Sequence, residues 1–237
     1  GHTAILPIGN YAANFSPNYK FVVTASFDST ARLWEVSTGK CLAVMKHKRA
    51  VSSAVFSPDG TKILTASSDK TAKLWDLNGK ELELYKGHTK GVRVGLFNGN
   101  DTIITASSDS SIRFWGNNGN LINIIHLDGG IKSLKRTNKG NFLASLNNST
   151  TLYFTKKGEI LNTITDTWHG FLSSDVDITN RDSLVISVTE KPGFQLKNIF
   201  TNELLQFSGH TALVWSIKFS NDFSKILSAS DDGTARL

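Results

Sequence analysis

The sequence predicts an all-β fold made of small antiparallel sheets that stack on one another. Three observations support this prediction. One segment recurs about every 40 residues along the 237-residue chain, short strand-like runs alternate with tight turns, and no helical pattern is evident. The even repeat favours a single continuous domain, residues 1–237, over two domains joined by a linker.

The repeat is plainest in the segment "SSDKTAKLWD" at 67–76. Close copies are "SFDSTARLWE" at 26–35, "SSDSSIRFWG" at 107–116 and "SDDGTARL" at 230–237, with weaker copies between the last two. The aspartate position falls 41, 40, 39, 43 and 41 residues apart, at Asp28, Asp69, Asp109, Asn148, Lys191 and Asp232. We therefore expect six units, at about 1–46, 47–86, 87–125, 126–167, 168–208 and 209–237.

The second unit shows how the first two strands of a unit are predicted. Residues 51–56 and 62–67 are short, largely apolar runs. Between them stands Ser57-Pro58-Asp59-Gly60, in which proline fixes φ and glycine supplies the permissive turn position. This pattern predicts two strands joined by a tight turn.

Two further strands follow in the same unit. Asp69 is expected to cap a tight turn, after which 71–75 alternates between polar and apolar residues. Asn78-Gly79 is a strong hairpin signal that leads to a fourth strand at 81–85. A four-stranded sheet of this size has two faces to cover, so neighbouring units must pack against both, and radial repetition achieves this with short edges.

Composition fits a folded protein in a reducing compartment. Hydrophobic residues make up 39% and charged residues 19%, which suits a buried core. No apolar run is nearly long enough to span a membrane, and no secretory signal is visible. The sequence is compatible with a targeting segment that precedes Gly1. The one cysteine, Cys41, excludes an internal disulfide and a cysteine-built zinc site, so we expect a cytoplasmic location.

The net charge favours acidic partners. It is +6, from 26 Lys and Arg against 20 Asp and Glu. The positive residues are spread along the chain and no window is dense enough to form a basic arm. Nucleic acid is therefore a weaker candidate ligand than protein.

The histidines follow the same repeat. They precede the aspartate positions by 26, 22, 21, 22, 22 and 22 residues, and they are His2, His47, His88, His126, His169 and His210. Four positions before each aspartate position stand Thr24, Thr65, Thr105, Ala144, Ser187 and Ser228. A complete unit thus carries a quartet of His, Thr or Ser, Asp and Trp.

These units resemble the WD40 family of β-propellers. The resemblance rests on "GHT" at 1–3, 87–89 and 209–211 and on "LWE", "LWD" and "FWG" at the ends of three units, and it covers the whole chain. In that family the quartet forms a hydrogen-bonded chain inside each blade, from Trp through Ser or Thr and His to Asp. The chemistry is reasonable, because a buried aspartate is costly unless an imidazole and turn amides satisfy it.

The resemblance implies three complete quartets and one that stops before its Trp. They are His2, Thr24, Asp28, Trp34; His47, Thr65, Asp69, Trp75; His88, Thr105, Asp109, Trp115; and His210, Ser228, Asp232. A nucleophilic triad needs an exposed nucleophile and occurs once, so the repetition favours a structural role. Each unit supplies one His and one Asp far apart along the chain, which disfavours metal ligation. We expect no catalytic residue, metal or cofactor.

The fourth unit departs from the pattern. Asn148, Ala144 and Phe154 replace the Asp, the hydroxyl and the Trp of the quartet. We expect that the quartet does not form there and that this blade is the looser one.

The fifth unit departs further. Lys191 and Lys197 stand at the Asp and Trp positions, and Pro192 falls inside the predicted third strand, where it would remove a ladder donor. Glu190 is a candidate to take over part of the acidic role. Neutral drift in blades held by their neighbours and a surface altered for a partner both explain such changes, and drift is the simpler explanation.

The two ends suggest an incomplete ring. The sequence opens at the Gly-His of one unit and stops before the Trp of another, so the last blade lacks its outer strand. Rings of the WD40 family usually close by sharing one blade between both termini. We expect a piece of a longer array, of seven blades or more, with further blades or domains attached in the full-length protein.

The resemblance also predicts a binding face, since WD40 propellers bind peptides or domains at the entrance of a central channel. Two positions per blade tend to face it. The residue before the turn aspartate is Phe27, Ser68, Ser108, Asn147, Glu190 or Asp231, and the position early in the first strand is Tyr11, Ser52, Arg93, Lys132, Ser174 or Trp215.

We expect an aromatic sector of Tyr11, Phe27 and Trp215 and a basic sector of Arg93 and Lys132 on this face. Such a face suits a peptide with an apolar anchor and an acidic or phosphorylated group. The alternative is that Trp215 packs on its own blade and Arg93 is merely solvated.

The leading prediction of function is a non-catalytic scaffold that binds proteins or peptides. One alternative is nucleic-acid binding through basic and aromatic residues. Another is a propeller enzyme with a site at the channel mouth, for which Glu190 and Asp231 are the acidic candidates and no histidine is left over.

Overall fold

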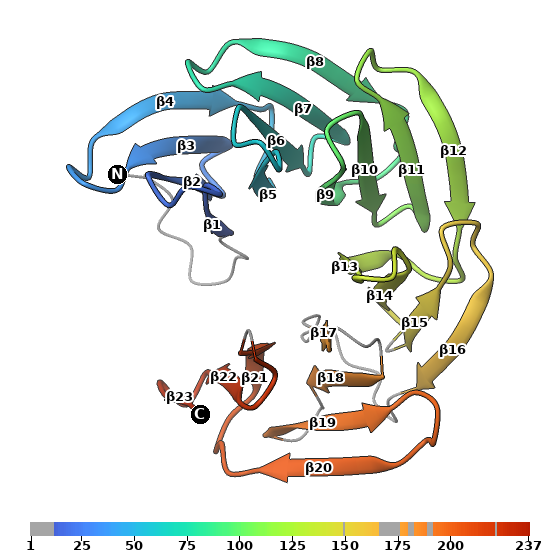
Figure 1. Ribbon diagram of the computed structural model, residues 1–237. Coiled ribbons are helices and arrows are strands. Elements are labelled where there is room, and N and C mark those ends of the chain that lie inside the picture. Colours follow the sequence, from blue (N-terminus) through green and yellow to red (C-terminus); the bar gives the residue numbers. More distant parts are fainter. Residues whose placement is uncertain (1–11, 149, 166–175, 180–182, 189–191, 221) are drawn as a thin grey trace. The chain divides into compact units, whose positions relative to one another are not determined.

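The computed structural model describes residues 12–148, 150–165, 176–179, 183–188, 192–220 and 222–237. Within these residues every regular element is a β-strand, which confirms the all-β prediction (Figure 1). They contain no helix that could cross a membrane. The chain divides into two compact units, Gly1–Asp128 and Gly129–Leu237.

The first unit holds three four-stranded antiparallel sheets whose strands are ordered as in the sequence. The first sheet consists of β1 (Ala13–Phe15), β2 (Phe21–Ala25), β3 (Thr30–Glu35) and β4 (Cys41–Lys46). The second consists of β5 (Val51–Phe56), β6 (Lys62–Ser67), β7 (Thr71–Asp76) and β8 (Glu81–Lys86). The third consists of β9 (Val92–Asn98), β10 (Thr102–Ser107), β11 (Ser111–Gly116) and β12 (Leu121–His126).

The second unit repeats this arrangement among its described residues. The fourth sheet consists of β13 (Ile131–Arg136), β14 (Phe142–Leu146), β15 (Thr150–Phe154) and β16 (Ile160–Thr165). The fifth consists of β17 (Val176–Ile178), β18 (Leu184–Val188), β19 (Gly193–Asn198) and β20 (Leu204–Ser208). The sixth has three described strands, β21 (Val214–Phe219), β22 (Ile226–Ser230) and β23 (Ala235–Arg236).

The predicted strands of the second repeat are confirmed. The ranges 51–56 and 62–67 coincide with β5 and β6, and the ranges 71–75 and 81–85 fall short of β7 and β8 by one residue each. The prediction that Pro192 lies inside a strand is wrong. β19 begins at Gly193, directly after the proline. The missing N–H of Pro192 therefore removes no hydrogen bond from the β-sheet.

The turn between β5 and β6 shows why these short hairpins form. The Ser57 hydroxyl donates to Asp59 Oδ1 at 2.6 Å and accepts from the Lys62 N–H at 2.9 Å. Asp59 Oδ1 also accepts from the Thr61 N–H at 2.9 Å. Gly60 takes a φ of +71°, a conformation that glycine adopts without steric cost.

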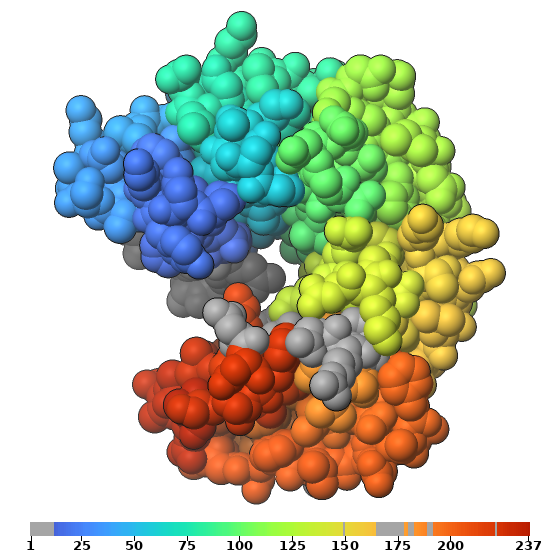
Figure 2. Space-filling model, viewed as in Figure 1, coloured from blue at the N-terminus to red at the C-terminus, as the bar shows by residue number. Residues whose placement is uncertain are grey.

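The core of each unit lies between neighbouring sheets. In the first unit, Val23, Leu33 and Met45 of the first sheet pack in one buried cluster with Val51 and Ala54 of the second. A second cluster joins the second and third sheets, and consists of Leu64, Ala72, Leu74, Tyr85, Ile103 and Trp115. The space-filling view shows the side chains of these three sheets in close contact (Figure 2). Each sheet therefore depends on its neighbour to bury its faces.

In the second unit, the fourth and fifth sheets share a buried cluster, as do the fifth and sixth. The first cluster consists of Leu143, Tyr153, Ile164, Ile178, Val185 and Ile199. The second consists of Ile186, Val188, Val214 and Ile217.

Candidate functional site

The quartet of the second sheet forms one chain of hydrogen bonds. The indole N–H of Trp75 donates to Thr65 Oγ1 at 2.7 Å. The same hydroxyl lies 2.8 Å from His47 Nε2, and His47 Nδ1 lies 3.0 Å from Asp69 Oδ2. An ionised carboxylate only accepts, so Nδ1 carries the proton and Nε2 accepts from the Thr65 hydroxyl.

Four different elements position these side chains. Thr65 and Trp75 lie on the paired strands β6 and β7, and Asp69 lies in the turn between them. His47 belongs to the connection from β4 to β5, so it ties the end of the first sheet to the second. Its ring stands edge-on to the Trp75 ring, with centroids 6.1 Å apart.

The turn at Asp69 uses both oxygens of the carboxylate. Oδ1 accepts from the N–H and the hydroxyl of Thr71, at 3.0 and 2.6 Å. Oδ2 accepts from the Lys48 N–H at 3.0 Å in addition to His47. No oxygen of this carboxylate is left for a substrate or a metal ion.

The electrostatics fix the charge states of the pair. Burial penalises the imidazolium and lowers the pKa of His47, which outweighs the attraction of Asp69. Burial acts to raise the pKa of Asp69, but hydrogen bonds from Thr71, Lys48 and His47 outweigh it and lower that pKa. At neutral pH a neutral imidazole therefore faces an ionised carboxylate.

The third sheet repeats this geometry closely. His88 Nδ1 lies 2.9 Å from Asp109 Oδ2, His88 Nε2 lies 2.8 Å from Thr105 Oγ1, and the Trp115 N–H donates to that hydroxyl at 2.8 Å. Burial lowers the pKa of His88. Burial opposes the lowering of the Asp109 pKa, yet hydrogen bonds from Ser111 and others bring it to about 2.

The first and sixth sheets hold parts of the quartet within the described residues. In the sixth, His210 lies 2.8 Å from both Asp232 Oδ2 and Ser228 Oγ. In the first, the Trp34 N–H donates to Thr24 Oγ1 at 2.8 Å. His2 lies outside the described residues. Asp28 Oδ1 accepts from the N–H of Thr30 in its own turn at 3.0 Å.

The fourth sheet corrects the placement of its histidine. His126 is the last residue of β12, pairs with Ser111 and is exposed. The next residue, Leu127, is buried, and its N–H donates to Ser110 O just as the His47 N–H donates to Ser29 O. Leu127 therefore occupies the place of the quartet histidine.

The reason is the apolar surroundings. Ala144 is fully buried and offers no hydroxyl, and the buried ring of Phe154 stacks on Phe142 with centroids 5.7 Å apart. An imidazole there would lack the hydroxyl that its Nε2 bonds in the second and third sheets, whereas a leucine side chain fits. Asn148 stays in its turn, where its Oδ1 accepts from the Thr150 N–H at 3.3 Å.

The fifth sheet contains a substitute that sequence reasoning missed. The Gln195 side-chain amide donates to Ser187 Oγ at 3.0 Å, and both residues are buried. Gln195 pairs with Ser187 across the ladder, so its amide reaches the hydroxyl that a Trp would otherwise reach. The available signal in the sequence was a side-chain amide four residues after Lys191, which stands at the aspartate position of this unit. His169, Glu190 and Lys191 lie outside the described residues, and Lys197 is half-buried on β19.

The quartets of the second and third sheets are closed to substrates. The Thr65 and Thr105 side chains are fully buried, so no substrate reaches either hydroxyl. Within the described part of the chain, no three His, Cys, Asp or Glu side chains lie close enough together to hold a metal ion.

Six of the eight residues predicted to bind a partner lie in the described ranges, the exceptions being Tyr11 and Glu190. Three are exposed, namely Phe27, Arg93 and Asp231. The other three are half-buried, namely Ser52, Lys132 and Trp215. The Arg93 Nε–H donates to Ser108 Oγ at 3.0 Å. This hydrogen bond joins a position early in the first strand of a unit, Arg93, to a position directly before the turn aspartate, Ser108. Phe27 and Arg93 belong to the first compact unit and Lys132 and Trp215 to the second, so the aromatic and basic sectors stay predictions.

A cluster of exposed cations surrounds the quartet turns of the second and third sheets. We call it the basic end, and it consists of Lys48, Arg49, Lys70, Lys90 and Arg93. Lys48 and Arg49 directly follow His47, and Lys90 follows His88 by two residues. The sequence prediction missed this group of cations, although their spacing from the histidines was a usable signal. The turns at the opposite end of the second sheet carry both signs, at Asp59, Lys62, Asp76 and Lys80.

The comparison with known families agrees with this geometry. The family model "WD domain, G-beta repeat" matches residues 1–35, 39–76, 79–116 and 201–237, which together make up more than half of the chain. The chain belongs to the WD40 repeat family. The matched ranges leave out 117–200, where the fourth and fifth sheets of this WD40 chain lack the full quartet. No match to a curated protein was found. WD40 repeats generally mediate protein–protein interaction and are generally non-catalytic.

Proposed function

We propose that this WD40 chain is a non-catalytic scaffold that binds an acidic or phosphorylated peptide, or a partner domain presenting one, at the end of its sheets where the quartet turns lie. The basic end supports the proposal most strongly. Its five side chains are exposed, while both oxygens of the nearby Asp69 carboxylate accept hydrogen bonds within the fold. The five cations outnumber the two ionised carboxylates of this end, Asp69 and Asp109, so the basic end keeps a positive net charge.

Other residues of the proposed face add to this surface. Phe27 is an exposed aromatic beside the Asp28 turn, and aromatic and arginine side chains are the types that most often dominate binding energy. The other residues predicted to bind a partner are Ser52 of the first compact unit and Lys132, Trp215 and Asp231 of the second, together with Tyr11 and Glu190, which lie outside the described residues. A cytoplasmic location is part of the proposal, because one cysteine in 237 residues suits a reducing compartment.

The test is a binding titration with paired variants. Fluorescence anisotropy would follow labelled phosphoserine- and glutamate-rich peptides on the wild type, on the K90E/R93E double variant and on K80E. Charge reversal at the basic end should weaken binding about tenfold or more. K80E reverses a charge at the opposite end of the second sheet and should leave affinity unchanged. Equal binding by all three proteins would overturn the proposal.

Nucleic acid is the competing ligand, because the basic end also suits a phosphate backbone. A labelled single-stranded oligonucleotide would be titrated at several salt concentrations beside the peptides. Tighter binding of the oligonucleotide, with a steep loss of affinity as salt rises, would favour nucleic-acid binding over peptide recognition.

A further inference from the structure

The fourth sheet carries a group of cations at the end opposite its quartet turn. We call it the fourth-sheet cluster, and it consists of Arg136, Lys139, Lys156 and Lys157, all of them exposed. Arg136 and Lys139 come from the end of β13 and the turn after it, and Lys156 and Lys157 come from the turn between β15 and β16. One row of paired residues crosses the four strands from Arg136 to Ile160, so the two turns lie at the same end of the sheet.

No other sheet has a cation at the place of Arg136. Arg136 pairs with Phe142, two residues before the quartet position Ala144. The residue with the matching partner is apolar in each of the other five sheets, where it is Phe15, Phe56, Phe97, Ile178 or Phe219. The phenylalanines of the second, third and sixth sheets pack against the buried clusters of those sheets, whereas Arg136 is exposed.

Lys139 stands where other first turns place a hydrogen-bond acceptor. In the first, second and sixth sheets, the serine hydroxyl that opens the turn donates to the side chain two residues later. The acceptors are Asn18, Asp59 and Asp222, at 2.8, 2.6 and 2.6 Å. The turn of the fourth sheet opens with Thr137, and the lysine two residues later has no acceptor. The fourth sheet therefore forgoes this hydrogen bond and presents a charge instead.

Lys156 likewise replaces a residue that serves packing elsewhere. It lies at the same place of its turn as Leu77, because Gly158 and Gly79 both donate to the carbonyl three residues back. Leu77 packs against the buried cluster of the first and second sheets, whereas Lys156 is exposed. Random drift has no reason to favour one sign of charge, so the fourth-sheet cluster indicates a surface adapted to an anionic partner.

One carboxylate opposes the four cations. Within the two turns, all of whose residues are described, Glu159 is the only acidic side chain. The guanidinium of Arg136 lies over the β13–β14 turn, where a Cβ added to Gly140 would stand 3.7 Å from Nη2. Arg136 therefore adds its charge to the turn that carries Lys139, and this end of the fourth sheet keeps a positive net charge.

An exposed aromatic residue adjoins the cluster. The Asn162 side-chain amide on β16 donates to Ile199 O at 2.7 Å, which holds the β19–β20 turn against β16 (Figure 1). The next residue, Phe200, is 67% exposed. The second residue after β3 and after β7 is polar, Ser37 and Asn78, so an aromatic residue at this place is particular to the fifth sheet among these three.

We propose that this edge of the second compact unit docks on the surface of an anionic lipid membrane. The four cations meet the lipid headgroups, and Phe200 and Ile160 enter the boundary between headgroups and acyl chains. Basic clusters beside exposed apolar side chains suit such surfaces. Ile160 is 56% exposed, and an aliphatic side chain does not stack on nucleic-acid bases as aromatic ones do.

Two further observations define the proposal. The cations stand on two neighbouring turns, which suits a flat lipid surface, whereas an extended peptide binds in a groove or along a strand edge. Exposed aliphatic residues recur on other outer strands, as at Leu42 and Leu82, so the assignment rests on the cations and Phe200. The site is separate from the basic end and does not depend on it.

The test is sedimentation of the protein with sucrose-loaded vesicles. The wild type should bind vesicles of phosphatidylcholine with about 30% phosphatidylserine but not phosphatidylcholine alone, and binding should weaken as salt rises. K156E/K157E should weaken the apparent affinity at least about tenfold, since each cation near such a surface contributes roughly fivefold. F200S should weaken it by about fivefold or more. All three residues are exposed, so the thermal midpoint of unfolding should stay unchanged.

K40E/K80E is the matched control, because Lys40 and Lys80 are exposed in the corresponding turns of the first and second sheets. It should bind the vesicles like the wild type, and so should K90E/R93E of the basic end. No binding to the phosphatidylserine vesicles, equal binding by K156E/K157E or by F200S, or an equal loss in either control would each overturn the proposal. Tighter binding of polyglutamate or of an oligonucleotide than of vesicles, lost in K156E/K157E, would assign the cluster to a soluble polyanion and overturn the membrane assignment.

Discussion

Nδ1 of His47 lies 3.0 Å from Oδ2 of Asp69, although 22 residues separate the two along the chain. His47 belongs to the connection that enters the second sheet, and Asp69 belongs to a turn within that sheet. Their contact therefore links the second sheet to the chain that leads into it, and the same contact recurs in the third sheet between His88 and Asp109. In these two sheets the polar quartet connects successive segments of the chain by buried hydrogen bonds.

The first prediction compares two histidines. H47A should lower the free energy of unfolding by about 2–3 kcal/mol, because it leaves the buried Thr65 hydroxyl and the Asp69 carboxylate short of a partner. H126A should change it by less than about 0.5 kcal/mol, since His126 is exposed at the end of β12. Denaturant unfolding followed by tryptophan fluorescence measures both. Equal effects would contradict the assignment of Leu127 to the histidine place.

The second prediction concerns the hydrogen bond from Trp75 to Thr65. Trp75→Phe keeps an aromatic ring but removes the N–H that donates at 2.7 Å. A double-mutant cycle with Thr65→Val should give a coupling energy of about 1 kcal/mol, the usual net value of a buried hydrogen bond. A coupling energy of zero, with additive losses, would mean that ring packing alone explains the choice of tryptophan.

The third prediction concerns pH. The pKa of His47 and of His88 in the folded chain lies below the ordinary value of 6.5. At a pH between the folded pKa and 6.5, the unfolded chain therefore binds protons that the folded chain does not. Stability is then fully present above about pH 6.5 and falls as the pH drops toward the folded pKa. The lowered pKa of Asp69 and of Asp109 adds a further loss as the pH falls below about 3.8.

Thermal unfolding between pH 8 and pH 5 checks the histidine part. The wild-type midpoint should fall toward acid, the H47Q/H88Q variant should show a shallower dependence, and H126Q should follow the wild type. A wild-type midpoint that rises toward pH 5 would show that the imidazoles are charged in the folded state.

The strands of the second sheet could be predicted because their turns carry local signals. Ser57-Pro58-Asp59-Gly60 and Asn78-Gly79 fix where β5, β6, β7 and β8 begin and end, with errors of one residue. Turn chemistry of this kind acts between neighbouring residues, so a single sequence is enough to reveal it.

Counting residues could not predict that Leu127, and not His126, occupies the place of the quartet histidine. The connection between sheets varies in length, since His47 directly follows β4 whereas Gly87 separates β8 from His88. A count of 22 residues therefore selects a histidine without fixing its backbone register. Ala144 offered a better signal, because it leaves an imidazole without the hydroxyl that Nε2 bonds in the complete quartets.

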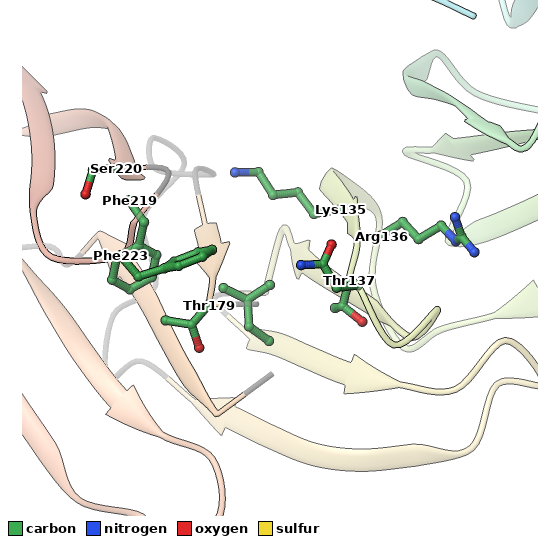
Figure 3. Close-up of a pocket in the computed structure, with 9 residues that line it drawn as sticks. Lys135, Arg136, Thr137, Thr179, Phe219, Ser220 and Phe223 are labelled. Carbon is green, nitrogen blue, oxygen red and sulfur yellow. The ribbon is translucent and has the colours of Figure 1, made fainter. Parts of the chain in front are cut away.

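A pocket of the second compact unit lay beyond sequence reasoning for another reason. Its lining comes from 135–138, from 178 and 179, and from 219, 220 and 223, which meet only when three sheets pack (Figure 3).

The last prediction tests the substitute donor of the fifth sheet. Gln195→Leu removes the amide that donates to the buried Ser187 hydroxyl at 3.0 Å, and it should lower the free energy of unfolding by about 1–3 kcal/mol. Gln206→Leu is the matched control, because Gln206 pairs with Gln195 across the ladder but is exposed on β20, and it should change stability by less than about 0.5 kcal/mol. Adding Ser187→Ala to Gln195→Leu should recover part of the loss, since the hydroxyl that needed the donor is then gone. If both glutamine variants unfold at the same denaturant concentration as the wild type, the amide does not replace the tryptophan of the quartet, and the fifth sheet is held by apolar packing with its neighbours.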